Sequence, residues 1–436
     1  MRTLVKRSAV ALAVAIAWLA APASAAVTYD FTLIADTTGP FSGFGRFVSI
    51  NNAGTVAFNA GLDAGGVGFF TGSGGAVTTI ADSNGPISTF TGGVAVINDA
   101  GTVAFFAVLD SGVRGIFAGN GGPLTTIADS AGDFDTGFGN PSINHSGVVA
   151  FSATLDAGGQ GIFTGSGGAT TTIATVPGPF LLGPLLSNPM INDAGTVAFN
   201  ARHGDGDPCP PSCSLSILTG DGGPLTTIAS TTSGFTILGA PPAINNAGTV
   251  AFRGFNPSGG IFTGEGGPIT TVADSSGPLN IVLANREVAI NNLGEVAFLA
   301  NLDAGGDCIL TGPDVVNDRV ICQGDSLFGT TIGNSAFPVL TTGNLGFFRD
   351  GLNDSGELSF WAQLTDGRQV VVRATPETAA AVPAPGTLVM LVLAAVPPIV
   401  WRARRRTAAC GPWAAVRRSG PRCRHEETLT GLRRPG

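Results

Sequence analysis

The sequence predicts an all-β fold: a seven-bladed β-propeller of four-stranded antiparallel blades, with the last blade closed by the N-terminal strand. A nine-residue phrase, INNAGTVAF at 50–58, occurs seven times with variation along the chain. Its asparagine recurs every 46 to 62 residues. A period in the forties that contains only strand and turn residues is typical of propeller blades. The two chain ends resemble different strands of one unit, which predicts that they complete one blade together.

Each unit divides into four expected strands. In the first copy, an innermost strand ends at Ile50, NAG makes a tight turn, and TVAFNA at 55–60 forms the second strand. LDAGG then leads into the third strand, GFFTG, and SGG leads into the fourth, AVTTIAD. Loops this short permit only an antiparallel meander. Phe58 and Ala57 point to opposite faces, so each blade presents a large residue to one neighbour and a small residue to the other.

The ends of the repeat region predict how the ring closes. The segment YDFTLIAD at 29–36 matches a fourth strand, and RQVVVRA at 368–374 matches a third strand. We therefore expect residues 26–375 to form the propeller, with 31–35 paired to 370–373. This closure removes exposed sheet edges.

The repeated asparagine and glycine are interpreted as hairpin-turn residues rather than a catalytic motif. Asparagine side chains bond to their own backbone two residues on, and glycine adopts positive φ at low cost. The residues concerned are Asn51, Gly54, Asn98, Gly101, Asn144, Gly147, Asn192, Gly195, Asn245, Gly248, Asn291, Gly294, Asn353 and Gly356.

Composition and charge narrow the class of partner. The chain is 44% hydrophobic and 12% charged, with 65 glycines, which fits short strands and glycine turns better than disorder. Between 26 and 386 there are 28 acidic and 9 basic residues. A body this acidic repels nucleic acid and anionic lipid surfaces, so nucleic-acid binding is excluded.

The N-terminus predicts export through the Sec pathway. Arg2, Lys6 and Arg7 precede an apolar run, and Ala23-Ser24-Ala25 provides a small-x-small cleavage pattern. Residues 1–25 are therefore expected to be a signal peptide. A transmembrane helix is the alternative, but the apolar run is shorter than the roughly 20 residues that spanning requires.

The C-terminus predicts a membrane stop. An Ala/Pro-rich linker at 376–386 precedes an apolar segment and arginine cluster at 387–406, and arginines remain on the cytoplasmic side. This region resembles the PEP-CTERM sorting signal, although Ala384 stands where the motif has an acidic residue. The resemblance implies processing by a membrane exosortase, transient inner-membrane anchoring, and transfer to the cell surface or extracellular matrix. No function is assigned to the Arg-rich tail at 407–436. The matching residues are Pro383, Ala384, Pro385, Gly386, Arg402, Arg404, Arg405 and Arg406.

The repeat region also resembles a family of exported bacterial proteins. The pattern NxxGxxAF, present in seven registered copies between 29 and 374, is similar to the NxxGxxAF tandem-repeat proteins. That resemblance implies display at the surface and carries no enzymatic activity with it.

Four cysteines of the exported region predict two local disulfides. Cys209 and Cys213 lie in CPPSC, and Cys308 and Cys322 flank an expected hairpin. Disulfides are usual in exported chains. Metal ligation is the alternative, but no histidine lies at a supporting spacing.

Few residues suggest chemistry, and the sequence predicts no catalytic residue, no cofactor and no metal site. His145 replaces a turn residue and is expected to be solvated. His203 lies in the expanded loop RHGDGDPCPPSC, where Asp205 and Asp207 make cation binding conceivable. A loop held by a disulfide is the favoured interpretation.

One rim of the ring is expected to be acidic, because the LDAGG-type turns and the fourth-strand exits share it. Aspartate is a good turn residue, which is the favoured interpretation; the alternative is a face that gathers cations or binds hydroxyl-rich or basic partners. Exposed apolar residues in VPGPFLLGPLL at 176–186 form a candidate contact patch. The rim aspartates are Asp63, Asp110, Asp156, Asp303 and Asp366, with Asp36, Asp82, Asp129 and Asp274 nearby.

Together these features predict an exported, noncatalytic binding or scaffold propeller with polysaccharide or another surface protein as partner. The PEP-CTERM resemblance implies an association with exopolysaccharide. The alternatives are a secreted carbohydrate lyase or hydrolase that uses the propeller funnel, and a coat protein without a ligand. A cluster of nonrepeating polar residues around the channel would favour an enzyme, and the sequence shows little such clustering outside 202–213.

Overall fold

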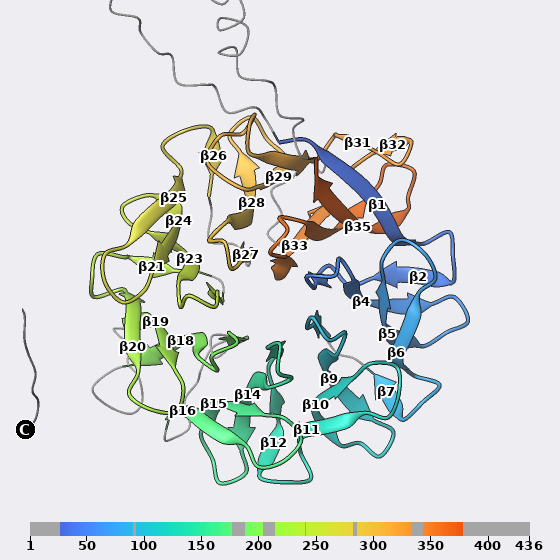
Figure 1. Cartoon of the computed structure of the whole chain (residues 1–436), viewed down its shortest axis with the longest axis vertical. Coiled ribbons are helices and arrows are strands. Elements are labelled where there is room, and N and C mark those ends of the chain that lie inside the picture. The colour runs from blue at the N-terminus through green and yellow to red at the C-terminus, as the bar shows by residue number, and fades with distance from the viewer. Residues whose placement is uncertain are drawn as a thin grey trace, which may run out of the picture. The chain divides into compact units, whose positions relative to one another are not determined.

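The computed structural model describes residues 27–89, 93–176, 188–203, 214–239, 241–281, 286–333 and 343–377. They form seven antiparallel sheets arranged radially around a central axis, and they include no helix (Figure 1). The predicted seven-bladed propeller is confirmed. The described residues do not include the predicted signal peptide, the predicted linker from 378 on, the predicted sorting signal, the Arg-rich tail or the loop with Cys209 and Cys213.

The second, third and fourth strands follow the repeat closely. The second strands are β4 (Val56–Leu62), β9 (Val103–Leu109), β14 (Val149–Leu155), β18 (Val197–His203), β23 (Val250–Phe255), β28 (Val296–Leu302) and β34 (Leu358–Gln363). The third strands are β5 (Val67–Gly72), β10 (Arg114–Gly119), β15 (Gln160–Gly165), β19 (Ser214–Gly220), β24 (Gly259–Gly264), β29 (Asp307–Leu310) and β35 (Gln369–Pro376). The fourth strands are β6 (Thr78–Asp82), β11 (Thr125–Asp129), β16 (Thr171–Val176), β20 (Thr226–Ser230), β25 (Thr270–Asp274), β30 (Arg319–Cys322) and, in blade 7, β1 (Tyr29–Asp36).

The innermost strand differs from the single strand that the sequence predicts. In blade 1, Phe44 pairs with Ala60 and Ser49 pairs with Ala57, so five steps along one strand match three along the other. The extra residues form a bulge, which divides the strand in two. Blades 1, 2, 3, 5 and 6 share this division, whereas blade 7 has one continuous strand. The inner strands are β2 (Phe41–Phe44), β3 (Ser49–Ile50), β7 (Ile87–Thr89), β8 (Ala95–Ile97), β12 (Phe134–Phe138), β13 (Ser142–Ile143), β17 (Met190–Ile191), β21 (Ile237–Leu238), β22 (Ala243–Ile244), β26 (Leu279–Asn280), β27 (Val288–Ile290) and β33 (Leu345–Leu352).

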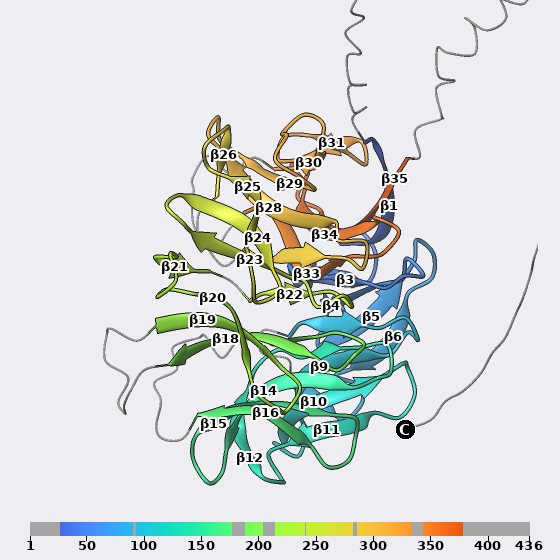
Figure 2. The ribbon, with the colours of Figure 1, turned by 60° about the vertical axis from the view of Figure 1, so that its left-hand side comes forward.

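The N-terminal strand closes the ring as predicted. β1 pairs antiparallel with β35, with Phe31 opposite Ala374 and Leu33 opposite Val372. Both views place these two strands side by side (Figures 1 and 2). The Glu377 backbone N–H then donates to the Thr28 carbonyl at 2.8 Å, so the pairing continues to the ends of the described chain.

Blade packing explains the alternation of large and small residues. Phe58 packs in the core cluster that contains Val371 of blade 7, whereas Ala57 packs in the cluster shared with blade 2. Phe69 and Phe105 meet across the blade 1–blade 2 interface with ring centroids 4.3 Å apart. Burial of one such ring contributes about 1.5–3 kcal/mol, so the interfaces are major sources of stability.

Blade 6 carries two additional features. Cys308 and Cys322 lie opposite each other on β29 and β30 and form a disulfide. The short hairpin of β31 (Ser326–Leu327) and β32 (Thr330–Thr331) follows and leads toward blade 7.

Candidate functional site

The repeated asparagines form the tight turns that enclose one end of the central channel. In blade 1, Asn51 Oδ1 accepts hydrogen bonds from the backbone N–H groups of Ala53 and Thr55 at 3.1 and 2.9 Å. In every blade, the repeated asparagine Oδ1 accepts the backbone N–H of the residue four positions later. Gly54, the last turn residue, has φ of +73°, and its counterparts are also positive, which glycine tolerates best. The structure thus places these residues in the turns where the sequence predicts them.

The same asparagines also join neighbouring blades, which the sequence does not predict. Asn51 Nδ2 donates to the Asn98 carbonyl of the next blade at 3.0 Å. The contact repeats around the ring at 3.0–3.2 Å until Asn353 Nδ2 donates back to the Asn51 carbonyl. These side chains are only 3–5% exposed. The seven amides therefore form a closed asparagine ring that ties every blade to the next.

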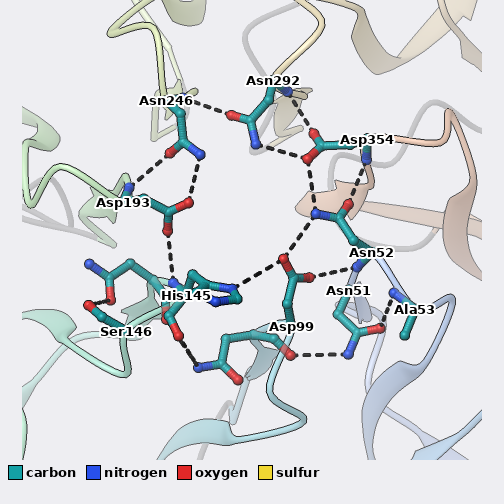
Figure 3. A network of polar contacts seen from close by, with 12 residues as sticks. Asn51, Asn52, Ala53, Asp99, His145, Ser146, Asp193, Asn246, Asn292 and Asp354 are labelled. Atoms are coloured by element: carbon teal, nitrogen blue, oxygen red, sulfur yellow. Dashed lines mark hydrogen bonds and ion pairs between the residues drawn. The ribbon is translucent and has the colours of Figure 1, made fainter.

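A second ring lies at the channel mouth, formed by the residues that follow these asparagines (Figure 3). Six of them donate a backbone N–H to the side chain of the next blade's residue at 2.8–2.9 Å. At the remaining junction, His145 Nδ1 lies 3.5 Å from Asp99 Oδ2, and the histidine side chain is 64% exposed. We call this set the mouth ring: Asn52, Asp99, His145, Asp193, Asn246, Asn292 and Asp354.

The channel end that these rings enclose is a cavity of about 150 Å³. Beneath the two polar rings lies a layer of aliphatic side chains, one from each blade. Met190, Arg349 and Asp350 complete the lining of the cavity. The aliphatic layer comprises Ile50, Ile97, Ile143, Ile191, Ile244, Ile290 and Leu352.

Arg349 occupies the channel beyond this layer. It extends from β33 of blade 7 to the far side of the ring, where Nη1 donates to the Asn188 carbonyl at 3.1 Å and Nη2 donates to the Pro141 carbonyl at 3.3 Å. Its own backbone N–H donates to Glu287 Oε2 of blade 6 at 3.2 Å. One residue therefore connects blades 3, 4, 6 and 7.

The carboxyl groups of Glu287 and Asp350 lie next to Arg349. Asp350 Oδ2 lies 3.6 Å from Arg349 Nε. Burial raises the pKa of Glu287 to about 7 and that of Asp350 to about 6, and the nearby Arg349 charge offsets only part of each shift. The expectation of little nonrepeating polar clustering around the channel is therefore wrong: Glu287, Arg349 and Asp350 form such a cluster. Glu287 lies in blade 6, whereas Arg349 and Asp350 lie more than 60 residues later in blade 7, so the packing of these two neighbouring blades brings them together.

The acidic rim has the hydrogen bonds expected of turns. The backbone N–H of Asp63 donates to the Pro40 carbonyl, and Asp110, Asp156 and Asp303 make the same contact in their blades. These side chains and that of Asp366 are exposed, and Asp366 pairs with Arg368 at 2.8 Å. The fourth-strand residues Asp36, Asp82, Asp129 and Asp274 each accept the backbone N–H two residues on. The hydrogen bonds named for these aspartates therefore lie within the turns of a single blade.

Several sequence candidates fall outside the described residues. These are Cys209, Cys213, Asp205, Asp207, the side chain of His203 and the apolar patch at 176–186, apart from the backbone of its first residue. Within the described ranges, no group of three or more histidine, cysteine, aspartate or glutamate residues could hold a metal ion. The part of the chain that the structure describes also has no helix able to span a bilayer.

Comparison with known families assigns the chain to one of them. A model of a family of unknown function (DUF7453) matches residues 30–167 and 136–326. The chain therefore belongs to this family. No curated protein matches the sequence.

Several solved structures show distant similarity to this chain. A mutant Aleuria aurantia lectin in complex with Fucalpha1-6GlcNAc is 10% identical, with a TM-score of 0.37 over 62% of this chain and 92% of the lectin. The SapL1 lectin in complex with alpha methyl fucoside is 13% identical, with a TM-score of 0.37 over 65% of this chain and 98% of the lectin. The Hadza microbial sialidase Hz136 is 10% identical, with a TM-score of 0.38 over 73% of each chain. Similarity this low supports no statement about ligand or activity.

Proposed function

We propose that this protein is an exported, noncatalytic propeller that binds or scaffolds at the cell surface or in the extracellular matrix. The observation that carries the proposal is that the residues repeated in every blade make the contacts that close the ring. The asparagine ring uses both ends of each amide, and the mouth ring pairs its polar side chains with one another. Residues that occur seven times therefore hold the blades together.

The outer surface is the part of the molecule left for a partner. The region from 26 to 386 carries 28 acidic and 9 basic residues, and the rim aspartates are exposed on short turns. Such a surface attracts cations and disfavours anionic partners. We therefore propose a neutral or amino-sugar polysaccharide, or a basic surface protein, as its partner. The N-terminal signal peptide and the PEP-CTERM-like segment support delivery to the surface.

A second candidate, a secreted carbohydrate-active enzyme, has one observation in its favour. Glu287 and Asp350 are carboxyl groups with raised pKa beside the channel, a feature that also occurs in active sites. However, Glu287 accepts the Arg349 backbone N–H, and the Arg349 side chain donates to backbone carbonyls of blades 3 and 4. The geometry therefore favours a structural role for the cluster.

Retention and product release separate the two functions. The purified exported chain would be passed over a panel of immobilised neutral, amino-sugar and acidic polysaccharides, with new reducing or unsaturated ends measured in the eluate. We expect retention on a neutral or amino-sugar polymer without product, and the same retention for Glu287→Gln. Product formation that disappears in Glu287→Gln would establish the enzyme and overturn the proposal. If none of the immobilised polymers retains the protein, a polysaccharide partner is contradicted.

A further inference from the structure

Arg253 is a buried cation at a blade interface that otherwise carries small or apolar residues. It lies on β23 of blade 5, on the same strand face as Ala251, and is 1% exposed. Its Nη2 donates to the Leu299 carbonyl of blade 6, so the guanidinium points toward that blade. The equivalent positions of the other blades are Asn59, Phe106, Ser152, Asn200, Leu299 and Trp361.

The guanidinium has more donors than the described residues satisfy. Nε and Nη1 of Arg253 are buried without a hydrogen-bond partner, and so is Nη1 of Arg286. Arg286 Nη2 pairs with Asp307 Oδ1 at 3.0 Å. The Asp307 carboxylate also accepts from Asn301 and Gln323, so its oxygens are engaged within blade 6. Three buried donor nitrogens, which together carry five N–H bonds, are left over.

The charges are unbalanced in the same place. Burial, with the nearby Arg286 charge, lowers the pKa of Arg253 to about 9, which still leaves it protonated at neutral pH. Arg286 pairs with the Asp307 carboxylate, whereas Arg253 has no carboxylate partner among the described residues. An unpaired buried charge is strongly unfavourable, and a negative group on the free N–H donors would relieve both the charge imbalance and the missing hydrogen bonds.

We propose that Arg253 and Arg286 form a binding site for one small oxyanion at the interface of blades 5 and 6. Arginine's planar fork of donors fits carboxylate, sulfate and phosphate oxygens. The Arg286 side chain is 16% exposed, so it links the site to solvent, while Arg253 forms the buried end. A small free ion fits this burial better than a polymer. The bound ion would fix blade 5 to blade 6 at a position where the other blades use neutral side chains.

Thermal unfolding of the full purified chain tests the site. Phosphate, sulfate and acetate would each be titrated against chloride at constant ionic strength, with calorimetry to measure stoichiometry. We expect a saturable rise in melting temperature for at least one oxyanion, with one ion bound per chain; an ion at a hundred times its dissociation constant gives about 2.7 kcal/mol of stabilisation. Arg253→Met should lose the saturable response, while Arg114→Gln, which removes an exposed arginine, should keep it.

Arg286→Gln provides a second test that leaves the buried arginine in place. We expect it to fold and to bind the same oxyanion at least tenfold more weakly. General salt stabilisation by sulfate is linear in concentration and should persist in all variants. The proposal is overturned if the wild-type chain shows no saturable response to any of the three ions, which would mean that water satisfies the free donors. An unchanged response in both Arg253→Met and Arg286→Gln would overturn it equally.

Discussion

At the scale of single residues, the repeated asparagine has two roles that only the folded ring reveals. Its oxygen shapes the turn within a blade, and its nitrogen crosses to the next blade. Aspartate would support the turn equally well, because its carboxylate accepts the same backbone N–H groups. Only an amide can also donate to the neighbouring carbonyl at neutral pH. The residue type is therefore determined by the contact between blades.

Substitution of Asn192 separates these two roles. Asn192→Ala leaves the Thr196 N–H without its buried partner, while the Asn245 carbonyl keeps only the Gly248 N–H, and should destabilise the fold by about 1–3 kcal/mol. Asn192→Asp should be at least as destabilising at pH 7, because a buried carboxylate then faces a carbonyl, and should recover in acid when it is protonated. Urea unfolding measures both. The control is Asn246→Ala at the exposed mouth ring, which should cost less than about 1 kcal/mol. If Asn192→Asp is as stable as wild type, the asparagine ring contributes nothing beyond its turns.

Glu287 predicts a pH dependence of stability. Its folded-state pKa of about 7 lies above its ordinary value of 4.5, so the folded state binds the proton more tightly than the unfolded state. Its contribution is therefore fully present below about pH 4.5 and is lost as the pH rises through 7. Glu287→Gln keeps a hydrogen-bond acceptor for Arg349 and should reduce the loss of stability between pH 5 and 8 by about 1–3 kcal/mol. Asp110→Asn, at an exposed turn, is the control. Identical pH profiles for wild type and Glu287→Gln would contradict the assignment.

At the scale of strands, the repeat made most of the fold predictable. The second, third and fourth strands keep the same order of large, small and turn residues in each copy, so their pairing and faces follow from the sequence. The inner strand was predicted less well, because residues 41–50 differ from their counterparts such as 87–97 and carry no repeated signal for a bulge. Arg253, Glu287 and Arg349 are nonrepeating residues, and no spacing indicates what they meet in other blades. The hydrogen bonds of the asparagines to the next blade could not be predicted, because a sequence period identifies equivalent positions but gives no distance between them across a blade interface.

The closing strand provides a prediction at the same scale. Deletion of 29–36 removes β1 and exposes the edge of β35 together with its apolar face. We expect loss of the monomer on size-exclusion chromatography, because an unpaired apolar edge promotes association. A synthetic peptide of sequence YDFTLIAD should restore part of the monomer by strand addition. A deleted chain that stays monomeric with an unchanged melting temperature would show that closure by β1 is dispensable.

At the scale of the whole molecule, the described propeller ends at Glu377, before the apolar segment and arginine cluster at 387–406. We therefore expect removal of 387–436 to release folded, soluble protein from the membrane fraction with the melting temperature of the full chain. Cell fractionation and thermal unfolding measure this outcome, with the full-length chain as the membrane-associated control. Aggregation of the shortened chain inside the cell would instead mean that the tail contributes to folding.

The central claim is that one continuous asparagine ring holds all seven blades together. Hydrogen exchange at the turn amides tests it most directly, because these N–H groups bond to the seven asparagine side chains. A closed ring opens as a unit, so the seven amides should share one high free energy of opening, close to that of global unfolding. Asn192→Ala should lower protection in all seven blades. Independent exchange of the turns, with loss of protection confined to blade 4 in Asn192→Ala, would contradict the account.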